Sequence, residues 1–465
     1  MPQLSNSEAD FLYQQGLQLS QARSYEDAIF TFDRVLSLRP DDYLAWYQRG
    51  MALYELGRYE EAAASFNQSL DLKPDYVEAL NSYGMALFNL GSYDAAIASY
   101  DKATRLKPDF HQVWYNRGNA LEKTGCYEDA LASYDRTIEL YPEYAKSWYN
   151  RGIILYRLGR YEEAIASYDM AIQFRPHYSN AWYNRANTLN KLNRYYDALV
   201  SYDRVLNIKP DWYGAWYNRG NMLHKLRRHE EATASYNKAL ELNPQLYEAW
   251  YNRGNALDAL GHYEEAIASY RNALKLKPDL REAWYNWGCA LHKLGRYEEA
   301  LTCYEKAIEL DPAFAKAWYS HGTALRKLGR YPEAINSFDQ AVRCQPDFYE
   351  AWYRRGLSLG HMGKNEDAIA SYDRALEINP NFYPAWYSRG AAFSHLGNYK
   401  AAAGCYDKTL QIKPDFPDAL SRRELAIGRY RQEQEQHAIA GERDEREGLQ
   451  QNDSTDVPSS SNSFY

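Results

Sequence analysis

The stretch Trp114-Tyr-Asn-Arg-Gly-Asn-Ala-Leu121 decides the fold, because it returns along the chain at a fixed spacing. Near-identical copies run from Trp216 to Leu223 and from Trp250 to Leu257, thirty-four residues apart. A repeat of this length is typical of an array of small supersecondary units. Such an array grows by adding repeats, so the 465 residues predict one solenoid rather than several globular domains. Weaker copies begin at Trp148, Trp182, Trp284, Trp318, Trp352 and Trp386.

A 34-residue frame with these tryptophans at position 4 divides residues 9–416 into twelve repeats without an insertion or deletion. Every repeat has proline at position 32, as at Pro108 and Pro142, and proline ends a helix because it lacks a backbone donor. Most repeats have glycine at position 15, such as Gly125, which suits a left-handed helix end. Apolar residues follow a helical period in both segments between these breaks. We therefore expect two amphipathic helices per repeat, A and B, which bury their apolar faces against the next repeat.

The recurring residues Trp, Gly, Tyr, Ala, Tyr or Phe, Ala and Pro stand at positions 4, 8, 17, 20, 24, 27 and 32. This pattern resembles the tetratricopeptide repeat over residues 9–416. The resemblance implies an all-α fold, a right-handed α-solenoid superhelix of stacked antiparallel helix pairs, with helix A lining the concave groove. At the ends we expect an N-terminal lead-in over 1–8 and a capping helix over 417–432. Residues 433–465, charged and then serine-rich, are expected to form a disordered tail.

Composition and charge exclude several classes of protein. The formal net charge is −8, and residues 417–465 carry much of it, so the array is close to neutral and a general polyanion binder is disfavoured. The five cysteines form no CxxC pair, which argues against disulfides and zinc and favours a reducing, cytoplasmic location. The first residues lack the features of a signal peptide, and no run of eighteen apolar residues exists, so no membrane span is expected.

Catalytic and metal-binding patterns are missing from the sequence. There is no glycine-rich phosphate loop and no HExxH motif. His361 and His395 share position 13 of adjacent repeats, and helix packing alone separates their backbones by about 8–10 Å or more. A zinc site instead needs converging ligands with bonds of about 2 Å. We therefore expect no enzyme, no cofactor and no metal.

The polar face of helix A carries the candidate site, at positions 2, 5, 6, 9, 12 and 13. An asparagine amide can pair with both the N–H and the C=O of an extended backbone, so a row of asparagines would hold a peptide without reading its sequence. The alternative is that tandem duplication copied an indifferent residue, although position 12 varies freely over the same six repeats. The candidate groove residues are Asn116, Asn119, Asn150, Asn184, Asn187, Asn218, Asn221, Asn252, Asn255, Asn286, Tyr115, Tyr149, Tyr183, Tyr217, Tyr251, Lys123, Lys191 and Lys225.

These patterns predict a non-enzymatic interaction scaffold that binds an extended protein or peptide segment in its concave groove. Lysines at position 13 favour an acidic ligand. Alternatives are a chaperone adaptor or complex-assembly factor, an RNA-binding helical repeat, and the regulatory subunit of a separately encoded enzyme. The family's carboxylate clamp for chaperone tails needs lysine at position 5, where this chain has tyrosine, and the neutral array disfavours nucleic acid.

Arginine at position 7 of eight repeats has no evident role, since it falls inside the apolar arc of helix A. A partner at position 25 of helix B in the same repeat is not supported, because Arg253 would then face Arg271. The sequence leaves this arginine unassigned.

Overall fold

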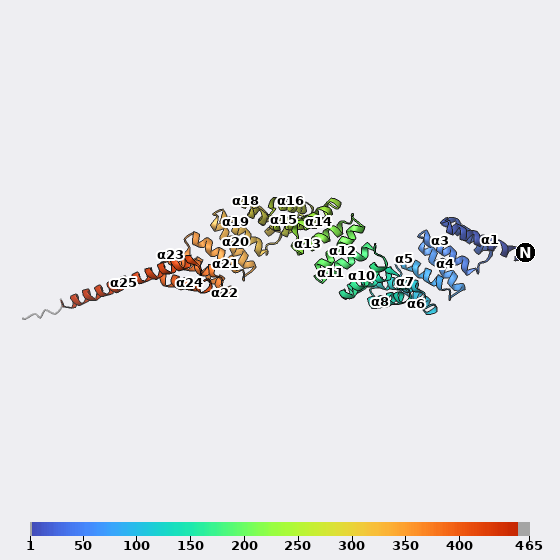
Figure 1. Ribbon diagram of the computed structural model, residues 1–465, viewed down its shortest axis with the longest axis horizontal. Coiled ribbons are helices and arrows are strands. Elements are labelled where there is room, and N and C mark those ends of the chain that lie inside the picture. The colour runs from blue at the N-terminus through green and yellow to red at the C-terminus, as the bar shows by residue number, and fades with distance from the viewer. Residues whose placement is uncertain (1, 454–465) are drawn as a thin grey trace, which may run out of the picture. The chain divides into compact units, whose positions relative to one another are not determined.

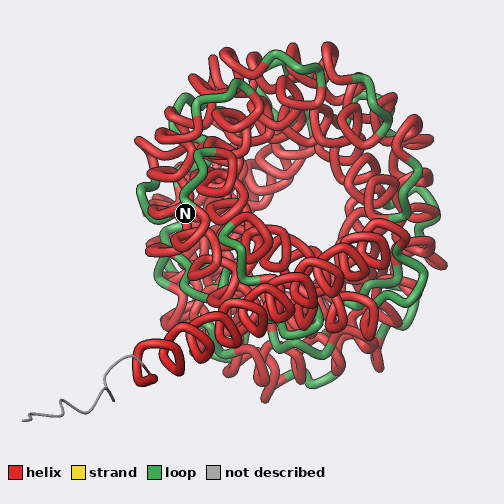
Figure 2. Tube along the Cα trace, turned by 90° about the vertical axis from the view of Figure 1, so that its left-hand side faces the viewer, coloured by secondary structure: helices red, strands yellow, loops and turns green. Residues whose placement is uncertain are grey.

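The structure is a computed structural model that describes residues 2–453, and the side chains of residues 7–440. All regular elements in this part of the chain are α-helices joined by short loops, which confirms the predicted all-α solenoid of helix pairs (Figure 2). The A helices carry odd numbers: α1 Pro2–Gln21, α3 Tyr43–Glu55, α5 Val77–Asn89, α7 His111–Thr124, α9 Ala145–Arg157, α11 Ser179–Lys191, α13 Tyr213–Lys225, α15 Tyr247–Ala259, α17 Arg281–Lys293, α19 Ala315–Lys327, α21 Tyr349–His361 and α23 Tyr383–His395. The B helices carry even numbers: α2 Tyr25–Leu38, α4 Tyr59–Leu72, α6 Tyr93–Leu106, α8 Tyr127–Leu140, α10 Tyr161–Phe174, α12 Tyr195–Ile208, α14 His229–Leu242, α16 Tyr263–Leu276, α18 Tyr297–Leu310, α20 Tyr331–Cys344, α22 Asn365–Ile378 and α24 Tyr399–Ile412.

Packing divides the chain into two compact units, Met1–Leu242 and Asn243–Tyr465. The first contains α1 to α14, and the second contains α15 to α24 followed by α25, Pro417–Asp453. Within each unit, an A helix packs against the B helix of its own repeat, and that B helix packs against the next A helix (Figure 1). Helix A therefore lies between two B helices and buries residues on both sides.

Small residues at position 8 make room for a large ring from helix B. A Cβ atom added at Gly118 would lie 2.7 Å from Cε1 of Tyr134, a contact too close for any side chain. Tyr134 is fully buried, as are Ala120 and Ala130 beside it. The sequence pattern of glycine, alanine and tyrosine is thus a packing code for one helix pair.

The recurring tryptophan closes the turn between repeats. Trp114 Nε1 donates a hydrogen bond to the carbonyl oxygen of Pro108, at 2.9 Å, and Pro108 belongs to the preceding repeat. The same bond joins Trp148 to Pro142 and Trp216 to Pro210, both at 2.8 Å. The tryptophan is therefore a structural residue that fixes the chain where one repeat passes into the next.

The turn inside each repeat needs a left-handed residue at position 15. Gly125 has a φ of +80°, which glycine adopts without steric cost. Three repeats place a larger residue there: Arg23, Asn193 and Arg227 have φ values of 61°, 59° and 59°. These positions carry backbone strain that the glycine repeats avoid.

Position-7 arginines bind the preceding repeat, which resolves the role that the sequence left open. Arg151 Nε donates to Oδ1 of Asp135 at 2.6 Å, and Asp135 stands at position 25 of the repeat before. Nη1 of Arg151 donates to Oγ of Ser167, at 2.7 Å, in its own repeat. The partner does stand at position 25 of helix B, but in the preceding repeat and not in the same repeat.

The ends differ from the expected boundaries. Helix α1 already begins at Pro2, inside the expected lead-in. Helix α25 continues past residue 432 to Asp453, where a disordered tail was expected. Glutamate, glutamine and arginine dominate 433–447, and all three are strong helix formers, so a solvated helix can persist there. The remainder of the expected tail, 454–465, lies outside the described residues. No helix in the described part of the chain combines the length and apolar character that a membrane span requires.

Candidate functional site

The position-6 asparagines bind their neighbours across the repeats. Asn150 Nδ2 donates to Oδ1 of Asn119, at 2.9 Å, and approaches the hydroxyl of Tyr115 at 3.3 Å. All three residues come from α7 and α9, the A helices of successive repeats, and each is half-buried. The amide nitrogen of Asn150 is therefore used in hydrogen bonds within the protein. The position-6 asparagines form a row in which hydrogen bonds connect the A helices of successive repeats. Equivalent bonds join Asn116 to Asn81, Asn184 to Tyr149, Asn218 to Tyr183 and Asn187, and Asn286 to Tyr251 and Asn255.

The position-9 asparagines are oriented by the buried tyrosine of their own helix pair. Tyr134 donates its hydroxyl proton to Oδ1 of Asn119, at 2.9 Å. That oxygen also accepts from Asn150, so two donors fix which way the Asn119 amide points. Its NH2 group faces the Tyr115 hydroxyl, to which it donates with one of its two hydrogens. The same tyrosine bond holds Asn187, Asn221 and Asn255.

The position-5 tyrosines are packing residues as much as groove residues. The ring centroid of Tyr115 lies 6.1 Å from that of Tyr134 and 5.1 Å from that of Tyr144. Tyr183 stacks on Trp212 with 4.5 Å between centroids. Burial raises the pKa of Tyr115, while hydrogen bonds from Asn119 and Asn150 oppose that rise. The sequence predicts these tyrosines as groove residues; in the structure the ring of Tyr115 packs against Tyr134 and Tyr144, and its hydroxyl lies at the asparagine row.

The lysines at position 13 differ in their surroundings. Lys225 Nζ lies 3.0 Å from Oδ1 of Asn190 and 4.7 Å from the ring centre of Tyr195. Lys123 and Lys191 are exposed, and neither makes an ion pair or side-chain hydrogen bond with the described part of the chain. The predicted lysine row is therefore partly engaged by the scaffold and partly open to a ligand.

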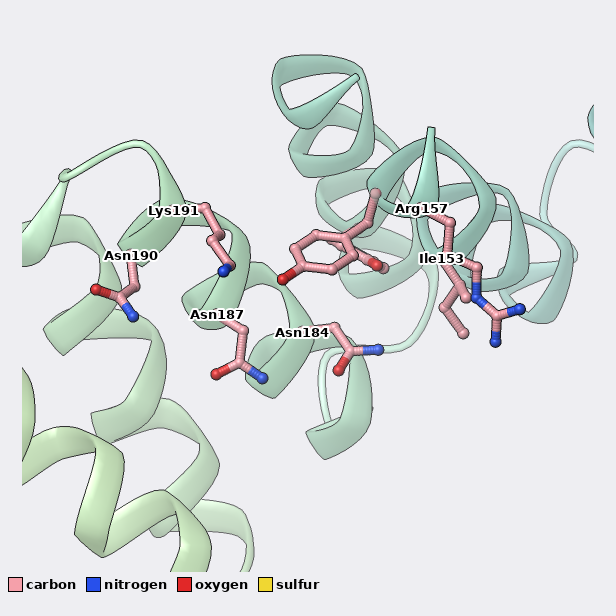
Figure 3. A pocket seen from close by; sticks show the side chains of 8 residues that line it. Ile153, Arg157, Asn184, Asn187, Asn190 and Lys191 are labelled. Atoms are coloured by element: carbon pink, nitrogen blue, oxygen red, sulfur yellow. The ribbon is translucent and has the colours of Figure 1, made fainter. Parts of the chain in front are cut away.

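A cavity of about 360 Å³ brings several candidates together between α9, α10 and α11. Figure 3 shows Asn184, Asn187, Asn190 and Lys191 along one face of α11, opposite Ile153 and Arg157 of α9. Tyr156 and Tyr168 complete its lining. The residues come from positions 6, 9, 12, 13 and 24 of two successive repeats.

The same positions form hollows elsewhere in the array. A cavity of about 220 Å³ in the first unit is lined by Asn116 and Asn119 together with Tyr54, Met85, Phe88, Asn89 and Tyr100. A cavity of about 250 Å³ in the second unit is lined by residues of α21 to α23 and by Arg422. The face formed by the A helices therefore repeats a pocket between neighbouring repeats, with side chains that vary from one to the next.

The 360 Å³ cavity is lined by hydrogen-bond donors, because the amide oxygens of two of its asparagines already accept hydrogen bonds from the protein. Oδ1 of Asn187 accepts from Tyr202 and from Asn218, and Oδ1 of Asn190 accepts from Lys225. Each NH2 group has two hydrogens, so Asn187, which also bonds the Tyr183 hydroxyl, keeps one donor for the cavity, and Asn190 keeps its own. Lys191 adds an ammonium group, and Arg157 adds a guanidinium that also contacts Glu122 at 3.2 Å. These groups suit a carboxylate or another anion.

Cys289, on the A-helix face, lacks the properties of a nucleophile. Burial raises the pKa of its thiol, although hydrogen bonds from Tyr285 and Tyr304 oppose that rise. A catalytic thiol requires the opposite shift, since the thiolate is the reactive form. Cys303 and Cys405 are buried as well.

Many solved structures resemble this chain, and three of them illustrate the range. YrrB, described as a TPR protein with an unusual peptide-binding site, is 28% identical over 41% of this chain and 97% of its own, with a TM-score of 0.37. MamA is 27% identical over 35% of this chain and 94% of its own, with a TM-score of 0.34. The APC/C hetero-tetramer Cut9–Hcn1 is 14% identical over 90% of this chain and 96% of its own, with a TM-score of 0.40. No curated protein sequence gave a significant match.

Models of sequence families identify the repeats directly. Two models described as tetratricopeptide repeat match residues 13–77, 115–179, 319–381 and 353–417, and residues 179–211, 213–246, 247–280 and 282–314. A third, described as TPR repeat, matches residues 84–125. The matched segments together cover most of the array, and the chain belongs to the tetratricopeptide repeat family.

Proposed function

We propose that the A-helix face binds an extended, acidic peptide segment, with the asparagine rows along its backbone and one carboxylate in the cavity between α9 and α11. Membership of the tetratricopeptide repeat family makes the chain a protein-interaction scaffold. The proposal concerns the surface and the chemistry of the ligand. The donor-rich cavity, in register with the asparagine rows, is the observation that carries it.

The atoms left over by the lateral bonds fit a peptide backbone. Oδ1 of Asn150 and of Asn184 accepts no hydrogen bond from other described side chains, so it can accept from a peptide N–H. The oriented NH2 group of Asn119 has two hydrogens, and the one that Tyr115 does not take can be donated to a peptide carbonyl. Packed helices lie about 8–10 Å apart, and an extended chain advances about 3.1–3.4 Å per residue, so about three residues would span one repeat.

The asparagine rows and the cavity should contribute differently to the free energy of peptide binding. Backbone hydrogen bonds contribute about 0.5–1.5 kcal/mol each, and ordering the segment costs about 2–5 kcal/mol. The asparagine rows alone therefore give weak binding that is indifferent to sequence. A hydrogen bond to a charged group contributes about 1.5–3 kcal/mol, so a carboxylate in the cavity would decide which segment binds.

A charge-reversal experiment tests the proposal. The probes are three fluorescein-labelled extended peptides that differ only in a central glutamate, glutamine or lysine, and the readout is fluorescence polarisation. The wild-type chain should prefer the glutamate peptide, and Lys191→Glu should reverse the preference. The matched control is Lys102→Glu, which reverses an exposed lysine on α6, a B helix, and should leave the preference intact.

Two outcomes would count against the proposal. One is an equal preference for glutamate in the wild-type chain and in Lys191→Glu. The other is displacement of the peptide by a single-stranded RNA whose binding falls steeply with salt, which would favour the nucleic-acid alternative.

A further inference from the structure

The seventh repeat, residues 213–246, has histidine at both position 12 and position 17, a combination that no other repeat has. His224 lies near the end of α13 at position 12, and His229 begins α14 at position 17. Position 17 is tyrosine in ten of the twelve repeats, and histidine only here. In the second repeat the two positions hold Tyr54 and Tyr59, whose ring centroids are 5.3 Å apart and nearly edge to face. The frame thus brings two rings together at this turn, and the seventh repeat makes both of them imidazoles.

The two imidazoles bring their Nδ1 atoms as close together as two nitrogens bound to one metal ion. Their ring centroids are 4.9 Å apart with an interplanar angle of 63°, and the two Nδ1 atoms are 3.3 Å apart. Tetrahedral zinc with Zn–N bonds of about 2.0–2.1 Å holds two ligand nitrogens about 3.3–3.4 Å apart. A hydrogen bond from an N–H donor is usually shorter, at about 2.9–3.0 Å. The observed Nδ1–Nδ1 separation therefore matches that of two nitrogens bound to one zinc ion.

Two charged residues adjacent to the pair in sequence are engaged elsewhere. Lys225, the next residue after His224, directs its ammonium to Asn190 at 3.0 Å and over the ring of Tyr195. Arg228, just before His229, binds Glu231 through Nε at 2.6 Å and through Nη2 at 2.7 Å.

We propose that His224 and His229 form a two-histidine site for a zinc-like divalent transition metal ion. Both rings bind through Nδ1 and keep their protons on Nε2. No third histidine, cysteine or carboxylate of the described chain converges on the pair, so water or donor atoms of a partner complete the coordination. The site is thus an exchangeable one, unlike the closed four-ligand sites that stabilise small folds. This inference is independent of the proposed peptide binding.

Metal titration of the full-length chain tests the inference. Tag-free protein is stripped with a chelator and titrated with ZnCl2 by calorimetry, and with CoCl2 by visible absorption, which reports tetrahedral coordination. The wild-type chain should bind one equivalent of metal ion. His229→Tyr should bind the ion with an affinity reduced by about tenfold or more. His229→Tyr installs the residue that ten other repeats carry, so the repeat should fold as they do.

The matched control is His292→Tyr, which changes another position-12 histidine, one whose partner ring is Tyr297. This variant should keep the zinc affinity of the wild-type chain. His224→Phe provides a second test, since the third repeat already pairs Phe88 with Tyr93 at these positions. No zinc binding by the wild-type chain, or unchanged binding in His229→Tyr and His224→Phe, overturns the inference.

Discussion

Arg117 donates its Nε to Oδ1 of Asp101 at 2.6 Å and thereby joins the fourth repeat to the third. Its Nη1 donates to Ser133 Oγ at 2.6 Å, so one guanidinium links two consecutive B helices through the A helix between them. The contact is repeated by Arg49 with Asp33, Arg151 with Asp135, Arg185 with Asp169, Arg219 with Asp203, Arg355 with Asp339, Arg389 with Asp373 and Arg423 with Asp407.

In three repeats, both positions of this pair change. Where position 7 is His321, the preceding position 25 is Glu305, and their side chains lie 3.6 Å apart. Where position 7 is Tyr83 or Trp287, the preceding position 25 holds no carboxylate but Asn67 or Arg271. In seven of the eight repeats with arginine at position 7, the preceding position 25 is aspartate; the eighth, Arg253, follows Asn237 and donates to Oγ of Ser269 at 2.5 Å. An acidic partner at the preceding position 25 thus accompanies most of these arginines, which offsets the cost of burying a charge. These pairs fix the register between neighbouring repeats.

Removal of the Arg117 guanidinium should destabilise the junction between the third and fourth repeats. We expect Arg117→Ala to cost about 1–3 kcal/mol, because a charge-assisted hydrogen bond is lost and its partners remain. In a double-mutant cycle with Asp101→Ala, the coupling should reach about 1 kcal/mol. Long repeat arrays depart from two-state unfolding, so amide hydrogen exchange over α6 and α7 is the better measurement.

The control for that cycle is Arg160→Ala. Arg160 binds Glu163 on the surface, and both side chains are about half exposed, at 45% and 49%. Such pairs contribute about 0–1 kcal/mol, so exchange over α9 and α10 should change little. Strict additivity of Arg117→Ala and Asp101→Ala would show that the pair does not couple the repeats.

Substitution of Arg227 by glycine should stabilise the chain. Arg227 has a φ of 59°, a conformation that costs a residue with a side chain about 1–2 kcal/mol and that glycine adopts freely. Glycine also has more conformational entropy in the unfolded chain, which offsets about 0.5–1 kcal/mol of this stabilisation. We expect a net gain of up to about 1 kcal/mol, seen as a higher Tm. Arg227→Ala keeps the strain and should show no such gain. Equal Tm values for the two variants would mean that the side chain, and not the backbone, sets the stability here.

Replacement of His321 by arginine should reduce the loss of folding stability that occurs as the pH falls. Burial lowers the pKa of His321 from its usual 6.5, while the nearby Glu305 opposes the shift. As the pH falls through 6.5, the unfolded histidine gains a proton that the folded one resists, so the unfolded state is favoured. Arginine stays charged throughout and is the residue that the other repeats pair with an acidic position 25.

Thermal melts of the wild-type chain and His321→Arg between about pH 7.5 and about pH 5 measure this effect. The Tm of the variant should exceed that of the wild-type chain by a margin that grows as the pH falls. Parallel Tm profiles would contradict the linkage.

Deletion of the Tyr149 hydroxyl should weaken peptide binding more than it weakens the fold. That hydroxyl accepts from Nδ2 of Asn184 at 3.1 Å, while the ring packs against Tyr168 and Tyr178. Tyr149→Phe keeps the ring, so the free energy of unfolding should fall by only about 0.5–1.5 kcal/mol. Asn184 is then no longer held in place, and the glutamate peptide should bind less tightly by fluorescence polarisation.

Tyr93→Phe is the matched control for that variant. Tyr93 begins α6, packs its ring against Phe88, and makes no side-chain hydrogen bond to the described residues. Its loss of a hydroxyl should change neither stability nor peptide binding. An effect of Tyr149→Phe on stability alone would assign the asparagine row to the fold and not to a ligand.

The helices themselves follow from local patterns that the sequence displays. Proline at position 32 and glycine at position 15 end helices, and apolar residues at a 3.6-residue period mark the buried faces, so the positions of α3 to α24 follow from the sequence alone. The long α25 could not, because charged, glutamine-rich composition suits both a solvated helix and a disordered chain.

The sequence by itself determined that the asparagines, tyrosines and lysines share one face of helix A, since helical periodicity is a property of each repeat alone. Only the tertiary structure decided which of their atoms a ligand could use. Asn150 meets Asn119 and Tyr115 at separations of 31 and 35 residues, and Arg117 meets Asp101 at a separation of 16, always across a repeat boundary. A pattern within one repeat fixes a helix face, whereas these bonds depend on how one repeat stacks on the next.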